Sequence, residues 1–127
     1  MMFIRLYDDD ERDLYVQLAD EIIRLIAEGT LTEGDELPSI RKLASRLQVN
    51  TKTVQAAYQK LADEGFIILR KKATAIVHQA QFNEQEWLQR WRNVLTRFQY
   101  ECRARNLSEQ ETMDLVHQLL TKEGERL

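Results

Sequence analysis

The sequence predicts a mainly helical protein with one small β-hairpin, followed by a helical tail. Apolar residues recur with helical spacing over most of the 127-residue chain. Between Gly65 and His78 this spacing gives way to two short runs of apolar and β-branched residues, which is typical of paired strands. After a polar break near residue 80, aromatic residues appear at helical spacing. We therefore expect two domains, residues 1–80 and 81–127.

Composition excludes several classes of protein. With 43% hydrophobic and 31% charged residues, the chain is expected to be globular rather than disordered. No apolar run approaches the length needed to cross a bilayer, and no signal-peptide pattern opens the chain, so no membrane association is expected. The single cysteine, Cys102, rules out an internal disulfide and fits a reducing, cytoplasmic location.

The first helix is expected over residues 14–26, where apolar side chains form a wide band. Residues 3–7 could form a short extended arm. The acidic run at residues 8–13 lacks the ordered spacing of a cation site, so we interpret it as a solvated helix start, where the helix dipole favours acids. Gly29 is expected to end the helix, and residues 30–36 to form a loop.

Two short amphipathic helices joined by a tight turn are predicted after this loop, which is the layout of a helix-turn-helix. Ser39 is well placed as the N-cap of the first helix, and Asn50 or Thr51 as that of the second. The turn falls at Gln48 and Val49. The buried faces are expected to consist of Ile40, Leu43, Ala44, Leu47, Val54, Ala57, Tyr58 and Leu61.

The outward faces of these two helices carry basic and amide side chains, which suit DNA. Amides pair with adenine and lysine with guanine in the major groove. From Arg41 to Lys72, eight basic and two acidic residues give a local charge of +6, in a chain whose formal net charge is −3. Such a concentration suits a phosphate-facing surface. The alternative is an ordinary helical domain whose charged face is only solvated.

A two-stranded hairpin is expected from residues 66–69 and 74–77, with a basic tip at residues 70–73. After a helix-turn-helix, such a hairpin is a wing. The alternative is a structural hairpin whose lysines keep an edge strand soluble.

The tail is expected to form a long helix from Glu84 and a second helix after a capping box at Ser108 and Glu111. Such a pair cannot bury two tryptophans against itself, so it must pack on the first domain, on a second copy, or on both. We interpret its apolar stripes as a homodimer surface, the alternative being an intramolecular core. The predicted dimerisation residues are Trp87, Trp91, Leu95, Phe98, Val116 and Leu120.

The segment with the predicted helix-turn-helix and hairpin resembles the GntR family of bacterial transcription regulators, and most closely its small YtrA-type members. The motifs that carry the resemblance are Gly29-Thr-Leu31, the run from Gly34 to Ala44, Val49-Asn50, Thr53-Val54-Gln55, Tyr58-Gln-Lys-Leu61 and Glu64-Gly65. The resemblance covers residues 6–77. It implies a winged helix-turn-helix that binds double-stranded operator DNA as a dimer, usually repressing transcription.

The resemblance also implies which residues bind DNA. Arg41 matches the family's DNA-contacting arginine, whereas Thr51 stands where many relatives have arginine, so base preference does not carry over. The family's two wing glycines correspond to Lys72 and Thr74, so we expect a stiffer tip that gives up the positive φ of glycine. The predicted DNA-binding residues are Ser39, Arg41, Lys42, Asn50, Thr51, Lys52, Thr53, Gln55, Arg70, Lys71 and Lys72.

No enzyme, metal or cofactor is expected. His78 and His117 lack ligands at zinc spacing, and Cys102 has no nearby base, so we expect it to pack as a small apolar residue. The sequence has neither a phosphate-cradling glycine loop nor a nucleophile elbow.

The predicted function is therefore sequence-specific DNA binding by a homodimeric transcription regulator, a repressor. One alternative is a winged-helix module that docks on another protein. Another is a metabolite-responsive sensor with a ligand between subunits, because residues 81–127 are too few to enclose a metabolite within one subunit.

Overall fold

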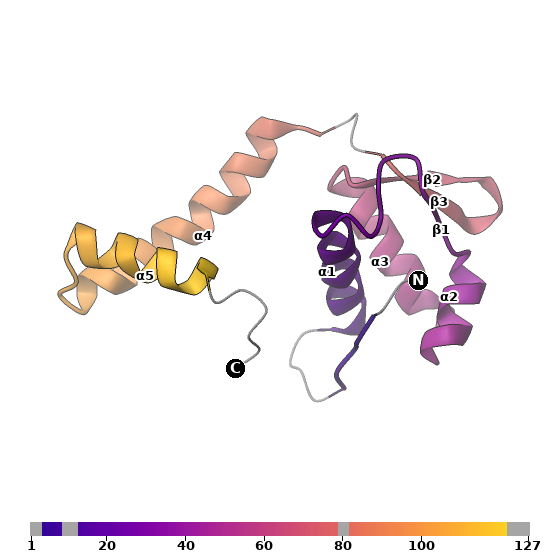
Figure 1. Ribbon diagram of the computed structural model, residues 1–127, viewed down its shortest axis with the longest axis horizontal. Coiled ribbons are helices and arrows are strands. Elements are labelled where there is room, and N and C mark those ends of the chain that lie inside the picture. The colour runs from indigo at the N-terminus through magenta and orange to yellow at the C-terminus, as the bar shows by residue number, and fades with distance from the viewer. Residues whose placement is uncertain (1–3, 9–12, 79–81, 122–127) are drawn as a thin grey trace. The chain divides into compact units, whose positions relative to one another are not determined.

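The computed structural model describes residues 4–8, 13–78 and 82–121, which divide into two compact units (Figure 1). The first unit, Met1–Phe82, holds helices α1 (Leu14–Ala27), α2 (Ile40–Leu47) and α3 (Thr51–Asp63) and a three-stranded antiparallel sheet. The second unit, Asn83–Leu127, holds helices α4 (Glu84–Ala104) and α5 (Glu109–Thr121). This agrees with the predicted fold class.

Helix α1 buries the wide apolar face that the sequence predicted, and Gly29, at a φ of 83°, follows its end. The buried side-chain amide of Gln17 also ties the N-terminal arm to this helix. The Tyr7 N–H donates to Gln17 Oε1 at 2.8 Å, and Gln17 Nε2 donates to the Tyr7 carbonyl at 2.9 Å. Residue 3 of the predicted arm lies outside the described part, as do residues 9–12 of the acidic run.

The helix-turn-helix has the predicted caps. Ser39 Oγ accepts a hydrogen bond from the Lys42 N–H at 3.2 Å, and Asn50 Oδ1 accepts one from the Lys52 N–H at 2.9 Å. Between the two helices, Gln48 takes a left-handed conformation with φ of 56°. This residue ends α2 and turns the chain into α3.

Helix α3 is the centre of the first unit, because it packs against α1, α2 and β2 (Ile67–Arg70) (Figure 1). Tyr58 is its largest fully buried side chain, and its hydroxyl donates to the Pro38 carbonyl at 2.7 Å. Burial raises the pKa of Tyr58 above its ordinary value. The other buried residues of the helix-turn-helix are Leu43, Ala44, Val54, Ala57 and Leu61, while Ile40 and Leu47 are half-buried against this core.

The sheet contains a strand that the sequence analysis missed. Strand β1 (Glu36–Leu37) pairs with β3 (Thr74–Val77), which also pairs with β2, so the strand order is β1-β3-β2. The sequence predicts a loop over residues 30–36 and a two-stranded hairpin, whereas β1 begins at Glu36 and the sheet has three strands. A two-residue strand is too short to show an alternating pattern, and its partner lies far along the chain. Strand β2 also begins one residue later than predicted and includes Arg70.

The wing tip corrects a second expectation. Lys71–Ala73 form a short 3-10 turn in which Lys72 has a φ of 66° and a ψ of 31°. Lys72 therefore adopts the left-handed conformation that we expected the loss of glycine to remove. The physical reason is the register, because Arg70 pairs directly with Thr74 and leaves only three residues to reverse the chain. A left-handed conformation costs an L-residue roughly 1–2 kcal/mol.

The second unit is a helical hairpin. Its capping box is present, since the Glu111 N–H donates to Ser108 Oγ at 3.1 Å and the Ser108 N–H donates to Glu111 Oε1 at 3.0 Å. Cys102 is buried on α4, which confirms its prediction as a small packing residue. In the described part of α5, no residue is fully buried.

We predict that Tyr58→Phe lowers the free energy of unfolding by about 1–3 kcal/mol, because it leaves the Pro38 carbonyl without its buried donor. The raised pKa of Tyr58 also predicts a dependence of stability on pH. The contribution of the neutral Tyr58 hydroxyl to the free energy of unfolding is fully present below the unfolded pKa of about 10. It is lost as pH rises further, because the tyrosine of the unfolded chain ionises first.

Urea unfolding of wild type and variant at neutral and alkaline pH measures both effects. Tyr100→Phe is the matched control, because the Tyr100 side chain is 61% exposed and its change should leave stability as it was. Equal stability of Tyr58→Phe and wild type at neutral pH would contradict the role of this hydrogen bond.

Candidate nucleic-acid interface

The first turns of α3 present polar side chains to solvent. Thr51, Lys52 and Gln55 are exposed, whereas Thr53 is half-buried. This division follows from helical spacing, because Val54 and the residues one and two turns after it face the core. The start of α3 therefore offers a short polar row that includes one cation and one amide.

Helix α2 of the same unit carries two further exposed cations. Arg41 and Lys42 are exposed, while Leu43 and Ala44, the next residues along the helix, are buried. Helix α2 packs on α3, so its outward cations and the polar row belong to the same unit. The predicted residues of both helices thus belong to one packed pair of helices.

Two of the predicted DNA-binding residues have a structural role. The Ser39 hydroxyl caps α2 and the Asn50 side-chain oxygen caps α3. Ser39 is half-buried and Asn50 is exposed. Replacing either residue would therefore disturb the helix ends as well as any contact with a ligand.

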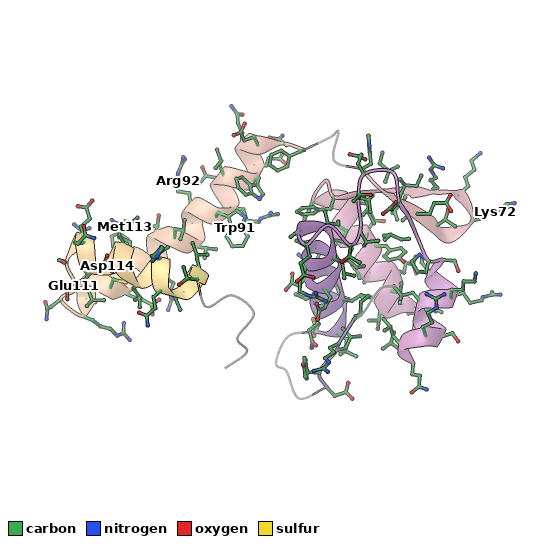
Figure 2. The ribbon with its side chains drawn as sticks, in the orientation of Figure 1. Lys72, Trp91, Arg92, Glu111, Met113 and Asp114 are labelled. Atoms are coloured by element: carbon green, nitrogen blue, oxygen red, sulfur yellow. The ribbon has the colours of Figure 1, made fainter. Side chains whose placement is uncertain are left out.

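The third predicted group lies on the wing. Arg70, Lys71 and Lys72 are all exposed. Figure 2 shows the Lys72 side chain at the far end of the β2–β3 hairpin, pointing away from the helices of the first unit. The left-handed backbone at this position and the long side chain together extend the positive charge beyond the tip.

The cations on α2, at the start of α3 and on the wing differ from other cations of the first unit in having no ion pair to a described residue. Lys60 Nζ lies 3.0 Å from a Glu64 carboxylate oxygen, and Arg24 contacts both Glu21 at 2.6 Å and Glu28 at 2.8 Å. Within residues 4–8 and 13–78, the cations that form no ion pair include Arg41, Lys42, Arg46, Lys52, Arg70, Lys71 and Lys72.

A surface hollow of about 520 Å³ lies between α2 and the sheet. It joins Ser39, Lys42 and Arg46 of the helix-turn-helix to Thr74 of the wing strand β3. Arg46 contributes to the local positive charge of the sequence but is not among the predicted DNA-binding residues. Only the fold reveals this neighbourhood, because the hollow depends on the pairing of β1 with β3.

Four of the six predicted dimerisation residues are exposed apolar side chains of the second unit. The exposed fractions are 46% for Trp91, 55% for Leu95 and 66% for Leu120, and Trp87 is exposed as well. Phe98 and Val116 are half-buried, and both line a cleft of about 710 Å³ between α4 and α5. Arg90 stacks over Trp91, with its guanidinium carbon 5.7 Å from the ring centroid.

His78 forms a side-chain contact at the end of the sheet. His78 Nδ1 lies 2.9 Å from Glu33 Oε2, which links the end of β3 to the loop before β1. Across the part of the chain that the structure describes, no cluster of histidine, cysteine and acidic residues could hold a metal ion. The helices described here also include none that is long and apolar enough to cross a membrane.

A helix-turn-helix whose exposed face is basic, followed by a basic hairpin, is the architecture of winged helix-turn-helix proteins. Residues 14–77 match the model of a family described as bacterial regulatory proteins, gntR family. The chain belongs to this GntR family. This confirms the resemblance that the motifs of the helix-turn-helix indicated.

Individual relatives agree with this assignment. The HTH-type pyridoxine biosynthesis transcriptional regulator PdxR of Corynebacterium glutamicum is 42% identical over 64 residues, which are 50% of this chain and 14% of that protein. The HTH-type transcriptional repressor YtrA of Bacillus subtilis is 38% identical over 68 residues, which are 53% of this chain and 52% of that protein. The match to this chain therefore covers about half of YtrA and a much smaller part of PdxR.

A solved structure extends the likeness into the second unit. YtrA from Sulfolobus acidocaldarius, a GntR-family transcription factor, is 42% identical with a TM-score of 0.64. The alignment covers 80% of this chain and 97% of that one. It therefore includes residues beyond those that the family model matches.

Proposed function

We propose that this protein is a sequence-specific DNA-binding transcription regulator that represses a promoter by occupying operator DNA as a homodimer. The observation that carries the proposal is the set of exposed cations on α2, the start of α3 and the wing, which have no carboxylate partner among the described residues. DNA phosphates would supply the missing counter-charges, and release of their condensed ions would drive binding.

The start of α3 is the proposed reading element. The major groove is wide enough to admit a helix, and Lys52 and Gln55 point outward from the first turns. Lys52 would donate to guanine O6 and N7, and the Gln55 amide would pair with the edge of an adenine. Asn50, Thr51 and Thr53 would lie beside them, with smaller side chains that reach bases or phosphates.

Helix α2 and the wing are the proposed positioning elements. Arg41, exposed on α2, would hold a phosphate or a base beside the groove. Arg70, Lys71 and Lys72 would approach the backbone or the minor groove. Because lysine acts as a flexible point charge, the wing would supply attraction that depends little on sequence.

A homodimer would explain the exposed apolar surface of the second unit. Single exposed apolar residues are ordinary, but the exposed Trp87, Trp91 and Leu95 follow one stripe of α4, and Leu120 is a further exposed apolar residue on α5. Covering this stripe with the same stripe of a second copy would remove it from water and hold two reading helices together. Two half-sites on the operator would then be bound at once.

The basic test is binding to DNA from the region upstream of the protein's own gene. A transcription repressor should shift a fragment of this DNA selectively, with affinity that falls steeply as salt rises. A fragment of random sequence is the control. Equal and weak affinity for both fragments would contradict sequence-specific regulation and would favour a winged domain that docks on protein.

We predict that Arg41→Ala weakens operator binding by roughly 1–3 kcal/mol if the guanidinium reads a base. The fold should persist, because Arg41 is exposed on α2. A phosphate contact would instead weaken binding to operator and random DNA alike and reduce the salt dependence. Titrations with both DNAs distinguish these cases, and unchanged affinity for both would remove Arg41 from the interface.

For the wing, we expect the double variant Lys71→Ala, Lys72→Gly to lose affinity for operator and random DNA by similar factors. Glycine is used at position 72 because alanine would stay strained at a φ of 66°. The slope of log affinity against log salt should fall by up to about two units, one for each lost phosphate contact. A loss confined to the operator would show that the wing reads sequence or groove shape.

For assembly, we expect the full-length protein to sediment as a dimer at micromolar concentration and Leu95→Glu to sediment as a monomer. The glutamate would place a charge in the proposed interface. Asn93→Glu is the matched control, since Asn93 is exposed on the opposite side of α4. A dimer that survives Leu95→Glu, or a monomeric wild type with full operator affinity, would exclude this interface.

A further inference from the structure

We propose that the hollow between α2 and the sheet is a phosphate groove, which binds the DNA backbone beside the reading helix through Arg46 and Lys42. This inference rests on the proposed function and deepens it, because it joins the predicted DNA-binding residues Ser39 and Lys42 to a cation that was not among them. Its new residue is Arg46.

The hollow is built from three parts of the first unit. One wall is α2, with Ser39, Lys42 and Arg46; the floor and the far side consist of Thr30, Leu31, Glu36, Leu37, Pro38 and Thr74. Its volume of about 520 Å³ is many times the roughly 30 Å³ that one water molecule occupies. A phosphodiester group with its hydration water therefore has room there.

Helical spacing directs the two cations into this hollow. Lys42 and Arg46 are four residues apart, so their side chains lie on one flank of α2. Leu43 and Ala44 occupy the buried flank, where α2 packs on α3. The groove therefore lies to the side of the reading helix, and a strand held in it would run beside the base contacts rather than through them.

The cations of the hollow are available to a ligand. Both side chains are exposed, and no ion pair to either is found among residues 4–8 and 13–78. Glu36 is the single carboxylate of the lining, and it lies on β1, opposite Ile76 of β3. Its negative charge would repel a phosphate, so removing this charge should strengthen DNA binding, whereas removing a cation should weaken it.

The groove continues into the wing. Thr74, which lines it, is paired with Arg70 across the β2–β3 hairpin, and its hydroxyl donates to the Lys71 carbonyl at 3.2 Å. Lys42 and Arg46 thus line the α2 side of the groove. The exposed Arg70 and Lys71 of the tip adjoin Thr74 on the other side. An open groove with cations on one wall and beside the opposite one suits an extended polyanion such as the DNA backbone.

The test uses the full-length protein and the change Arg46→Gln, with salt titrations of binding to operator and to random DNA. Loss of one phosphate contact should reduce the salt slope by about 0.9. Taken from about 1 M salt down to about 0.15 M, this difference in slope corresponds to roughly fivefold weaker binding by the variant. The loss should be equal for the two DNAs, because phosphate contacts carry no sequence information.

Two further variants make the result specific. Glu36→Gln should strengthen binding to both DNAs, because it removes the charge that opposes the phosphate. Lys60→Gln is the control for the loss of a positive charge in the same unit, since Lys60 is already paired with Glu64 and should leave binding unchanged. If Arg46→Gln fails to fold, Lys42→Gln tests the same groove.

The outcomes separate this inference from the proposed function. If wild type binds the operator selectively while Arg46→Gln and Lys42→Gln keep its affinity and salt slope, the groove is excluded and the regulator function stands. A loss on the operator alone would also overturn the inference, because Arg46 would then read bases or shape. If wild type binds no DNA in a salt-dependent manner, both proposals fail.

Discussion

The first unit depends on the contact between the Tyr58 hydroxyl and the Pro38 carbonyl, 2.7 Å apart in the core. Pro38 follows β1 directly and lies two residues before α2, so this bond fixes α3 relative to both elements. The ring fills the centre of the unit, and the hydroxyl satisfies a carbonyl that the strand and helix leave without a partner. The position of the polar row on α3 relative to α2 therefore depends on a buried side chain that no DNA could touch.

The cations of the first unit fall into two groups, those paired with a described carboxylate and those that are not. Cations on the side of α1 and on the later turns of α3 are paired with carboxylates, as Arg24 and Lys60 show. Cations on α2, at the start of α3 and at the wing tip are not paired with any described carboxylate. Unpaired charges repel one another in the free protein, and a polyanion relieves this repulsion.

The fold class and the helix caps could be predicted because their signals are local. Ser39, Asn50 and the Ser108 capping box each act on a backbone N–H two or three residues away. The apolar faces of α2 and α3 likewise follow from spacing within a single helix. Residue types at fixed short separations were sufficient for the family resemblance as well.

The sequence by itself thus determined the helices, the hairpin and the basic character of one surface. Only the tertiary structure decided the third strand, the conformation of Lys72 and the hollow that contains Arg46. The third strand and the hollow depend on contacts between distant segments, β1 with β3 and α2 with the sheet edge, and the conformation of Lys72 depends on the exact register of Arg70 with Thr74. Such contacts leave no periodic trace in the chain, because each side of the pair is only a few residues long and its partner is chosen by the packed core.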